Sequence, residues 1–412
     1  MKRGIIRVSP LPGGPGRISA ALDLPTGETR VLELSEKAEL YPGENREPLL
    51  DGDYENNGGD LTWATVGAMP LAINLGLDLV VDGVVQEGLP ERLNGYSAIW
   101  QDWRPDLFQA VEVRAESEVT LSEGRAGLVV ALSGGLDSLH TLRHVRSANP
   151  GEPVVAVMLW GFDHSKEDPT FLDYARTTAG LLADVDVRLC LTETNWTRVG
   201  SVDIAMDFAA GLASALHGFG HGTRKGFSGA DQHRDQAMQF IPVAHNPVTD
   251  PLLSSDQFPI ETFGFDHTRL EKCEDIASDQ TAMAILRVCH TYNCGVCEKC
   301  QRTRWGMFSI GVDHPPTFGR SLPFPRPWVS LSKPLKLQIF EGMWVPILRR
   351  AEQSRPGTPG LRRLRIQYRM IKWGIENRGP WRVPFLRRLF VAVADFEKRA
   401  RGKLERLRHK AR

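Results

Sequence analysis

Short apolar runs alternate with helical patterns through the middle of the chain. The first run, GLVVAL at 127–132, is continuous, as in a strand that is buried on both faces of a parallel sheet, and a helical pattern follows it. Further strands are expected at 153–162 and 186–195, and further helices at 171–185 and 206–220. Strands that alternate with helices predict a doubly wound, parallel α/β domain over 123–315.

The flanking regions have different patterns. Residues 1–122 mix short apolar stretches with Gly, Pro and Asn, and we expect a small α+β domain there. It would contain a helix at 62–76, ended by Gly76, and two short strands within 77–89 around a turn at Asp82-Gly83. After a proline-rich connector, apolar residues at helical spacing predict two to four basic amphipathic helices over 330–412.

Charge divides the chain in the same way. The 412 residues carry 50 Lys and Arg and 50 Asp and Glu, so the formal net charge is zero. Residues 331–412 hold 22 basic against 6 acidic side chains, and the preceding 330 hold 28 against 44. An acidic body therefore carries a basic tail. We expect the tail to dock on the chain's own acidic body or on a partner protein. Binding to nucleic acid or to an anionic membrane surface is the alternative. A homodimer is a separate expectation for the chain.

Export and membrane insertion are both unexpected from the sequence. No apolar run reaches the roughly 18 residues that a membrane helix needs. The first residues are basic but lack the apolar segment of a secretory signal. These features predict a cytoplasmic protein without a membrane span.

The expected first strand runs directly into Ser133-Gly134-Gly135-Leu136-Asp137-Ser138. The two glycines let the backbone approach an anion closely, and the helix that follows offers unpaired N–H groups to phosphate oxygens. Ser133 and Ser138 add hydroxyl donors. Asp137 has the wrong charge for a phosphate contact, and we expect it to hold a Mg²⁺ ion that bridges phosphate oxygens.

The alternative for this segment is an ordinary capped turn, with Ser or Asp as the capping residue. Neither a Walker A loop nor a dinucleotide-binding GxGxxG fingerprint is present. The position between a buried strand and a helix favours phosphate binding, because that is the context in which such a loop works.

GLVVALSGGLDSLHTL resembles the PP-loop of the N-type ATP pyrophosphatases. This resemblance implies that ATP is cleaved between its α and β phosphates, that AMP is transferred to a substrate oxygen, and that a nucleophile then displaces AMP. Ser133, Gly134, Gly135, Asp137 and Ser138 would hold the departing pyrophosphate and its Mg²⁺, with Asp137 and Ser138 closest to the chemistry. The backbone at Leu159 would lie beside adenine. Asp163, after the second strand, is expected to contact ribose or substrate or to cap a turn.

Four of the six cysteines fall within twelve residues: Cys289, Cys294, Cys297 and Cys300. Four thiolates make a closed tetrahedral Zn²⁺ site, so a structural zinc is expected, with an iron–sulfur cluster as the alternative. The CG-x-C-x₂-C core is similar to the zinc motif of the 7-cyano-7-deazaguanine synthases among PP-loop enzymes. The first spacing is shorter here, and only Arg302 and Arg304 lie near the position of an arginine in that motif.

Several other residues are candidates for the same site. The segment Ser228–Asp231 is expected to close it from a later strand end, with Asp231 a second Mg²⁺ or substrate contact or part of a turn. His245 has a catalytic and a structural interpretation. Arg269 and Lys272 could neutralise pyrophosphate, although a solvated helix face is the commoner explanation.

The function expected from these features is that of a ligase. ATP would adenylate a carboxylate or similar oxygen of a small molecule, with release of pyrophosphate, and C–N bond formation would follow. A tRNA-modifying PP-loop enzyme, which would perform lysidine-type ligation or thiolation, is one alternative. A nucleotide-binding regulator without turnover is the other. The expected cofactors are ATP, Mg²⁺ and Zn²⁺.

Overall fold

A computed structural model describes most of the chain, in two compact units, 1–266 and 267–412. The described residues are 4–37, 47–50, 59–122, 125–162, 166–168, 170–239, 245–289, 293–295, 297–318, 337–358 and 360–376. Asp163 and the tail beyond residue 376 lie outside them.

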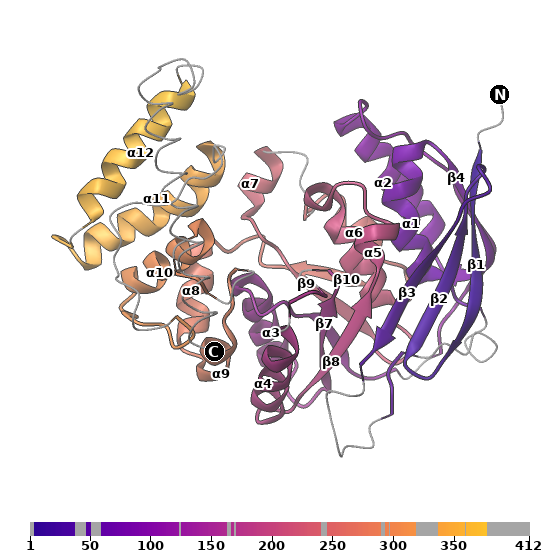
Figure 1. Ribbon diagram of the computed structural model, residues 1–412, viewed down its shortest axis with the longest axis horizontal. Coiled ribbons are helices and arrows are strands. Elements are labelled where there is room, and N and C mark those ends of the chain that lie inside the picture. Colours follow the sequence, from indigo (N-terminus) through magenta and orange to yellow (C-terminus); the bar gives the residue numbers. More distant parts are fainter. Residues whose placement is uncertain are drawn as a thin grey trace. The chain divides into compact units, whose positions relative to one another are not determined.

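One ten-stranded sheet organises the first unit (Figure 1). Its strands are β1 (Ile5–Gly14), β2 (Arg17–Asp23), β3 (Thr29–Glu36), β4 (Asp78–Gln86), β5 (Val113–Val119), β6 (Leu128–Ala131), β7 (Val154–Trp160), β8 (Val187–Thr194), β9 (Lys225–Gly229) and β10 (Ile260–Phe263). They are ordered β10-β9-β6-β7-β8-β3-β2-β1-β4-β5. Only the three junctions of β8 with β3, β3 with β2, and β2 with β1 are antiparallel. The sheet is therefore mostly parallel, which confirms the expected α/β class.

The five strands from β6 to β10 form the half of the sheet that the apolar runs predicted. In chain order they are arranged 3-2-1-4-5, with the first strand, β6, between β7 and β9. This order is consistent with a Rossmann-like fold. The chain leaves β6 toward one side of the sheet and returns to β9 on the other, so the strand order reverses at β6.

Helices cover both faces of this half of the sheet (Figure 1). The helices of the first unit are α1 (Thr62–Leu75), α2 (Leu89–Trp103), α3 (Leu136–Ala148), α4 (Phe171–Ala183), α5 (Trp196–Val199), α6 (Ile204–His217) and α7 (Arg234–Gln239), with a 3₁₀ turn η2 (Asp250–Leu253). Helices α3 and α4 pack on one face, and α6, backed by α1, packs on the other. β7 is consequently buried along nearly its whole length, as its continuous apolar sequence predicted.

The region expected to be a separate N-terminal domain contributes strands to the same sheet. Residues 34–36 of β3 pair with 192–194 of β8, so the sheet continues across the boundary drawn at residue 122. Helix α1 is almost entirely buried and ends at Gly76 in the left-handed conformation, as expected. The two strands expected within 77–89 are wrong: β4 is one strand, and Asp82-Gly83 marks a register shift between Val81 and Val84.

The second unit is helical in its described part. It contains α8 (Arg269–Ala277), α9 (Gln280–Ile285), α10 (Glu298–Ser309), α11 (Leu337–Ser354) and α12 (Leu361–Glu376). Its core includes Trp305, Trp344 and Ile347, each with no exposed surface, and Trp344 Nε1 donates a 2.9 Å hydrogen bond to Glu298. The beginning of the predicted tail therefore packs on α10 rather than standing apart. No helix in the described parts of the chain combines the length and apolarity needed to cross a membrane.

Candidate functional site

The segment Ser133–Ser138 lies where the sequence placed it, between the end of β6 and the first turn of α3. Gly134 has φ +76°, a conformation that favours glycine, and Gly135 is the extended residue that precedes the helix. An added Cβ on Gly134 would lie 1.7 Å from the hydroxyl oxygen of Tyr174 in α4. Both the backbone conformation and the close approach therefore require glycine at this position.

The two serine hydroxyls hold the loop together. Ser138 Oγ accepts a hydrogen bond from the Ser133 amide at 3.2 Å and donates one to the Gly135 carbonyl at 3.1 Å. The Gly135 amide in turn donates to Ser133 Oγ at 3.3 Å. In this structure the two hydroxyls thus fix the loop's shape. The phosphate contacts expected of them stay a prediction.

Helix α3 begins directly after the loop. The first N–H groups of any helix have no acceptor within the helix, and the helix dipole makes this end positive. The residue before α3 is Gly135, and no side-chain capping bond is present at this helix in the described chain. Asp137 lies in the same first turn. The loop therefore combines backbone donors for an anion with a carboxylate that can bind a cation.

The end of β9 approaches this turn directly. β9 pairs with β6, and a Cβ on Gly229 would lie 2.8 Å from the carbonyl carbon and oxygen of Asp137. Asp231 follows two residues later. The structure thus brings the segment Ser228–Asp231 beside Ser133–Ser138, at the reversal of strand order where open α/β sheets bind ligands.

Leu159 lies on β7, the other neighbour of β6. Its side chain is 5% exposed and packs in the core, so only its backbone could face a ligand at the sheet edge. Asp163, which was expected to contact ribose or substrate, lies outside the described residues.

A histidine–aspartate pair lies in the connection between β9 and β10. His245 Nδ1 is 2.8 Å from Asp250 Oδ2, and the two side chains are 3% and 5% exposed. His245 was a candidate from the sequence, but its partner was not. Asp250 is the first residue of η2, and nothing in the local sequence indicates which side chain it meets.

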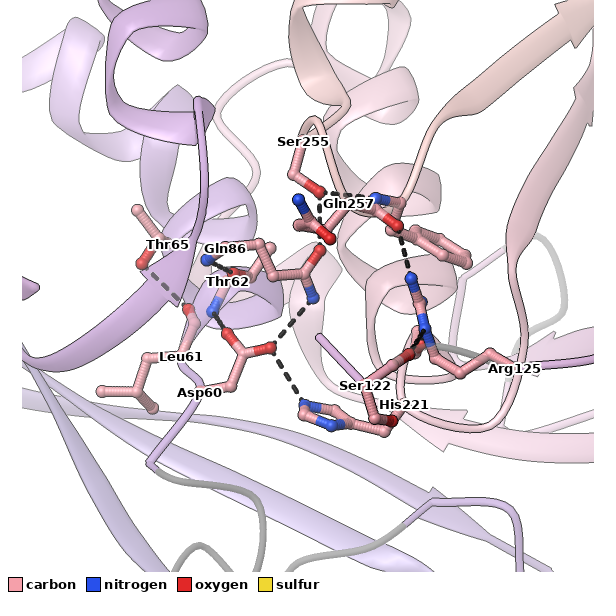
Figure 2. A network of polar contacts seen from close by, with 12 residues as sticks. Asp60, Leu61, Thr62, Thr65, Gln86, Ser122, Arg125, His221, Ser255 and Gln257 are labelled. Atoms are coloured by element: carbon pink, nitrogen blue, oxygen red, sulfur yellow. Dashed lines mark hydrogen bonds and ion pairs between the residues drawn. The ribbon is translucent and has the colours of Figure 1, made fainter. Parts of the chain in front are cut away.

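A buried polar network holds the segment that follows η2 (Figure 2). Asp60 Oδ2 accepts hydrogen bonds from Gln86 Nε2 at 2.9 Å and from the His221 ring at 3.0 Å. Gln86 Oε1 accepts one from Ser255 Oγ at 2.6 Å. Burial alone raises the pKa of Asp60, but the hydrogen bonds from His221 and Gln86 outweigh burial and lower it.

Arg125 makes further hydrogen bonds to the segment that follows η2. Its guanidinium donates to the carbonyl of Gln257 at 2.7 Å (Figure 2). It also donates to the carbonyls of Gly220 and Thr223 at 2.6 and 3.0 Å. The turn that carries Asp250 is therefore fixed to strand β4 and to the end of α6.

The second unit carries the cysteine cluster. The four sulfur atoms of Cys289, Cys294, Cys297 and Cys300 all lie within 4.8 Å of one another. Gly295 adopts φ +71°, which lets the chain turn after the second cysteine, and Cys297 Sγ accepts a 3.5 Å hydrogen bond from the Cys300 amide at the start of α10. The sequence spacing therefore predicted the grouping correctly.

The electrostatics of the cluster favour a cation. Hydrogen bonds with the sulfurs of Cys289, Cys294 and Cys297 raise the pKa of the Cys300 thiol, because ionisation would remove the proton that takes part in those bonds. A metal ion removes that penalty by neutralising the thiolates. The donor set and its size fit a tetrahedral ion such as Zn²⁺.

The remaining candidates differ from the expected surface residues. Lys272 is 1% exposed, so a solvated helix face does not explain it, whereas Arg269 is half-buried and donates to Thr303 Oγ1 at 3.2 Å. Cys190 lies within β8, and burial raises the pKa of its thiol well above the usual value. Cys190 is therefore an unreactive core thiol.

In comparisons with known proteins, no family model matches this chain, and no curated protein matches it with significant similarity.

Proposed function

We propose that the protein is an ATP-dependent, AMP- and pyrophosphate-forming synthetase of the PP-loop type. The observation that carries this proposal is the uncapped first turn of α3, which follows Gly134 and Gly135 and is faced by Gly229 of β9. Open N–H groups at a helix N-terminus bind phosphate oxygens. Two carboxylates, Asp137 and Asp231, lie in the two segments that meet there.

In the proposed reaction, an oxygen of a small-molecule acceptor attacks the α-phosphorus of ATP. The new P–O bond forms as the bond to the β-phosphate bridging oxygen breaks, and pyrophosphate leaves with that electron pair. Backbone N–H groups in the first turn of α3 would receive the leaving group. The carboxylate of Asp137 would hold Mg²⁺, which would supply charge neutralisation. An amine then displaces AMP to form the C–N bond. Positioning and electrostatic stabilisation provide the catalysis.

The cysteine cluster has a structural role in this proposal. Four cysteine ligands fill a tetrahedral zinc site and leave no position for substrate. Zinc at Cys289, Cys294, Cys297 and Cys300 would fix the start of α10 and the residues before it. The zinc ion would thus stabilise the second unit without taking part in ATP cleavage.

Product analysis tests the proposal. The protein is incubated with MgATP and a panel of small carboxylic acids, with and without ammonia, and the nucleotide products are separated. AMP and pyrophosphate should form, and Asp137→Ala should abolish both. Asp173→Ala, an exposed change in the first turn of α4, should leave turnover intact. Formation of ADP as the product would overturn the proposal.

A further inference from the structure

Helices α11 and α12 are held on α10 by apolar and polar contacts, and α12 packs on α11 (Figure 1). Leu361 and Leu364 of α12 are 5% and 1% exposed and share an apolar core with Trp305 of α10. Ser354 Oγ, at the end of α11, donates a 2.7 Å hydrogen bond to the carbonyl of Ser309, at the end of α10. The inner face of α12 is therefore fixed, and its outer face is presented by a packed helical unit.

The outer face of α12 carries four exposed arginines. Arg362, Arg365 and Arg369 follow one another at i, i+3 and i+7, which places them on one side of the helix, and Arg363 adjoins them. Arg365 lies 2.6 Å from Glu352 of α11, whereas the other three arginines have no ion-pair partner among the described residues. We call these four arginines the arginine face.

The positive charge of α12 is not balanced within the helix. Its sixteen residues include five basic side chains and one acidic side chain. The arginines before α12 are balanced by carboxylates: Arg350 lies 3.4 Å from Glu274, and Arg355 lies 2.8 Å from Asp313. On the arginine face, like charges lie about one turn apart, and such neighbours repel one another. This face therefore fits an anionic partner.

The apolar side of α12 argues against a membrane as that partner. A helix that lies on a membrane buries its apolar face at the boundary of the acyl chains. In α12 that face is already covered by the core shared with α10 and α11. Ile366 is the one large apolar side chain listed among the arginines as exposed in the described part of α12, at 45%, and a single side chain is too little to anchor a helix.

The side-chain chemistry of the arginine face suits phosphodiester groups. The planar guanidinium presents two parallel N–H donors to a phosphate and is more weakly hydrated than the ammonium group of lysine. From Arg362 to Arg369 the helix rises by about 10 Å, so the arginines can contact successive phosphates of one strand.

We propose that the arginine face binds the phosphate backbone of a nucleic acid. Arg362, Arg363 and Arg369 are the main contacts, since no described carboxylate pairs with them. Contacts to phosphate carry no sequence information, so the binding depends on salt concentration and little on base sequence. This inference is independent of the proposed synthetase activity, because no step of ATP cleavage uses the arginine face.

Fluorescence anisotropy of labelled RNA and DNA strands of about 20 nucleotides, longer than a typical single-strand site, tests the proposal with the full-length protein. The triple variant Arg362→Gln, Arg363→Gln, Arg369→Gln should bind either strand about 10-fold more weakly, because each exposed ion pair contributes modestly. The slope of log K against log salt should fall by about 2, at about 0.7 per phosphate contact of a single strand.

A matched control separates this face from net charge. The triple variant Arg17→Gln, Arg114→Gln, Arg176→Gln loses the same three charges from exposed side chains of the first unit and should bind like the wild type. Circular dichroism checks that both triple variants are folded. If the first triple variant does not fold, Arg362→Gln and Arg369→Gln decide the question singly, each with an expected loss of about twofold.

Three results would overturn the proposal. The wild type could bind neither strand at about 50 mM salt, where phosphate contacts are strong. The folded arginine-face variant could bind as tightly as the wild type. Lastly, the wild type could bind phosphatidylserine vesicles or polyglutamate but neither nucleic acid strand, which would assign the face to a membrane or to an acidic protein surface, the chain's own acidic body included.

Discussion

Gly229 and Asp137 lie so close that a single methyl group would not fit between them. A Cβ on Gly229 would be 2.8 Å from two backbone atoms of Asp137 and 3.0 Å from Thr141 Oγ1. The contact joins the end of β9 to the first turn of α3. The absence of a side chain at residue 229 therefore lets the two halves of the candidate phosphate site meet.

Replacing this glycine should separate the two halves. In Gly229→Ala the new methyl group would push the end of β9 away from the backbone of Asp137. We expect a loss of about 1–3 kcal/mol in the free energy of unfolding, together with weaker MgATP binding. Gly180→Ala is the control, because Gly180 lies within α4 with no atom within 4 Å of an added Cβ. That change should be neutral or stabilising. Urea unfolding and calorimetry measure both effects, and equal behaviour of the two variants would contradict the packing argument.

The cysteine cluster should bind about one equivalent of zinc per chain, as measured by elemental analysis of the purified protein. Cys289→Ser and Cys300→Ser each remove a ligand, so both should lose the metal and part of the helical circular dichroism signal. Cys190→Ala should keep the metal, because Cys190 lies within β8 of the other unit. Broad visible absorbance with bound iron would instead identify an iron–sulfur cluster.

Local patterns in the sequence predicted the features that depend on nearby residues. The loop at 133–138 joins a strand to a helix, and four cysteines within twelve residues can only surround a small volume, so both were found directly. The partnership of His245 with Asp250, and of Asp250 with Thr262, depends on how η2 packs beside β10. No periodicity in the sequence encodes such a contact.

Contacts between distant residues also explain why the structure of residues 1–122 differs from the one expected. The apolar pattern there predicted short strands but not their neighbours, and the pairing of β3 with β8 joins residues more than 150 positions apart. At Asp82-Gly83 the local signal was misleading, because Asp-Gly is common in hairpin turns as well as at irregularities within a strand. Strand β4 pairs with β1 on one side and with β5 on the other, so the segment forms one strand rather than a hairpin.

Asp60 gives a pH-dependent prediction. Its pKa is lowered in the folded protein, so its contribution to stability is present above the pKa of the unfolded chain and is lost as pH falls through the folded value. Asp60→Asn should therefore cost about 1–3 kcal/mol at pH 7 and less at pH 3, because below the ordinary pKa of 3.8 the unfolded wild-type chain takes up a proton more readily than the folded carboxylate does.

The control for this change is Asp106→Asn. Asp106 is paired with Arg104, but its side chain is 61% exposed, and such exposed pairs contribute little to stability. Urea unfolding at pH 7 and pH 3 compares the two variants. A loss in Asp60→Asn that is the same at both pH values would contradict a role for the ionised carboxylate.

His217 should make the protein less stable as the pH falls from about 6.5 to 4. Its Nε2 lies 2.8 Å from the Leu253 carbonyl, and its buried Nδ1 has no hydrogen-bond partner among the described residues. Burial lowers the pKa of His217 to about 4, since a second N–H there would have no acceptor. The unfolded chain takes up a proton below its own pKa of about 6.5, whereas the folded protein does not until about pH 4.

The contribution of His217 to the free energy of unfolding is therefore fully present above pH 6.5. It declines by about 1.4 kcal/mol per pH unit between pH 6.5 and pH 4. His217→Gln keeps a donor for the Leu253 carbonyl but cannot titrate, so its unfolding free energy should fall less steeply than that of the wild type. Urea unfolding at pH 7, 6, 5 and 4 measures the two slopes. Identical slopes in His217→Gln and the wild type would show that this histidine accepts a proton in the folded state, and would place the acid sensitivity of the first unit elsewhere.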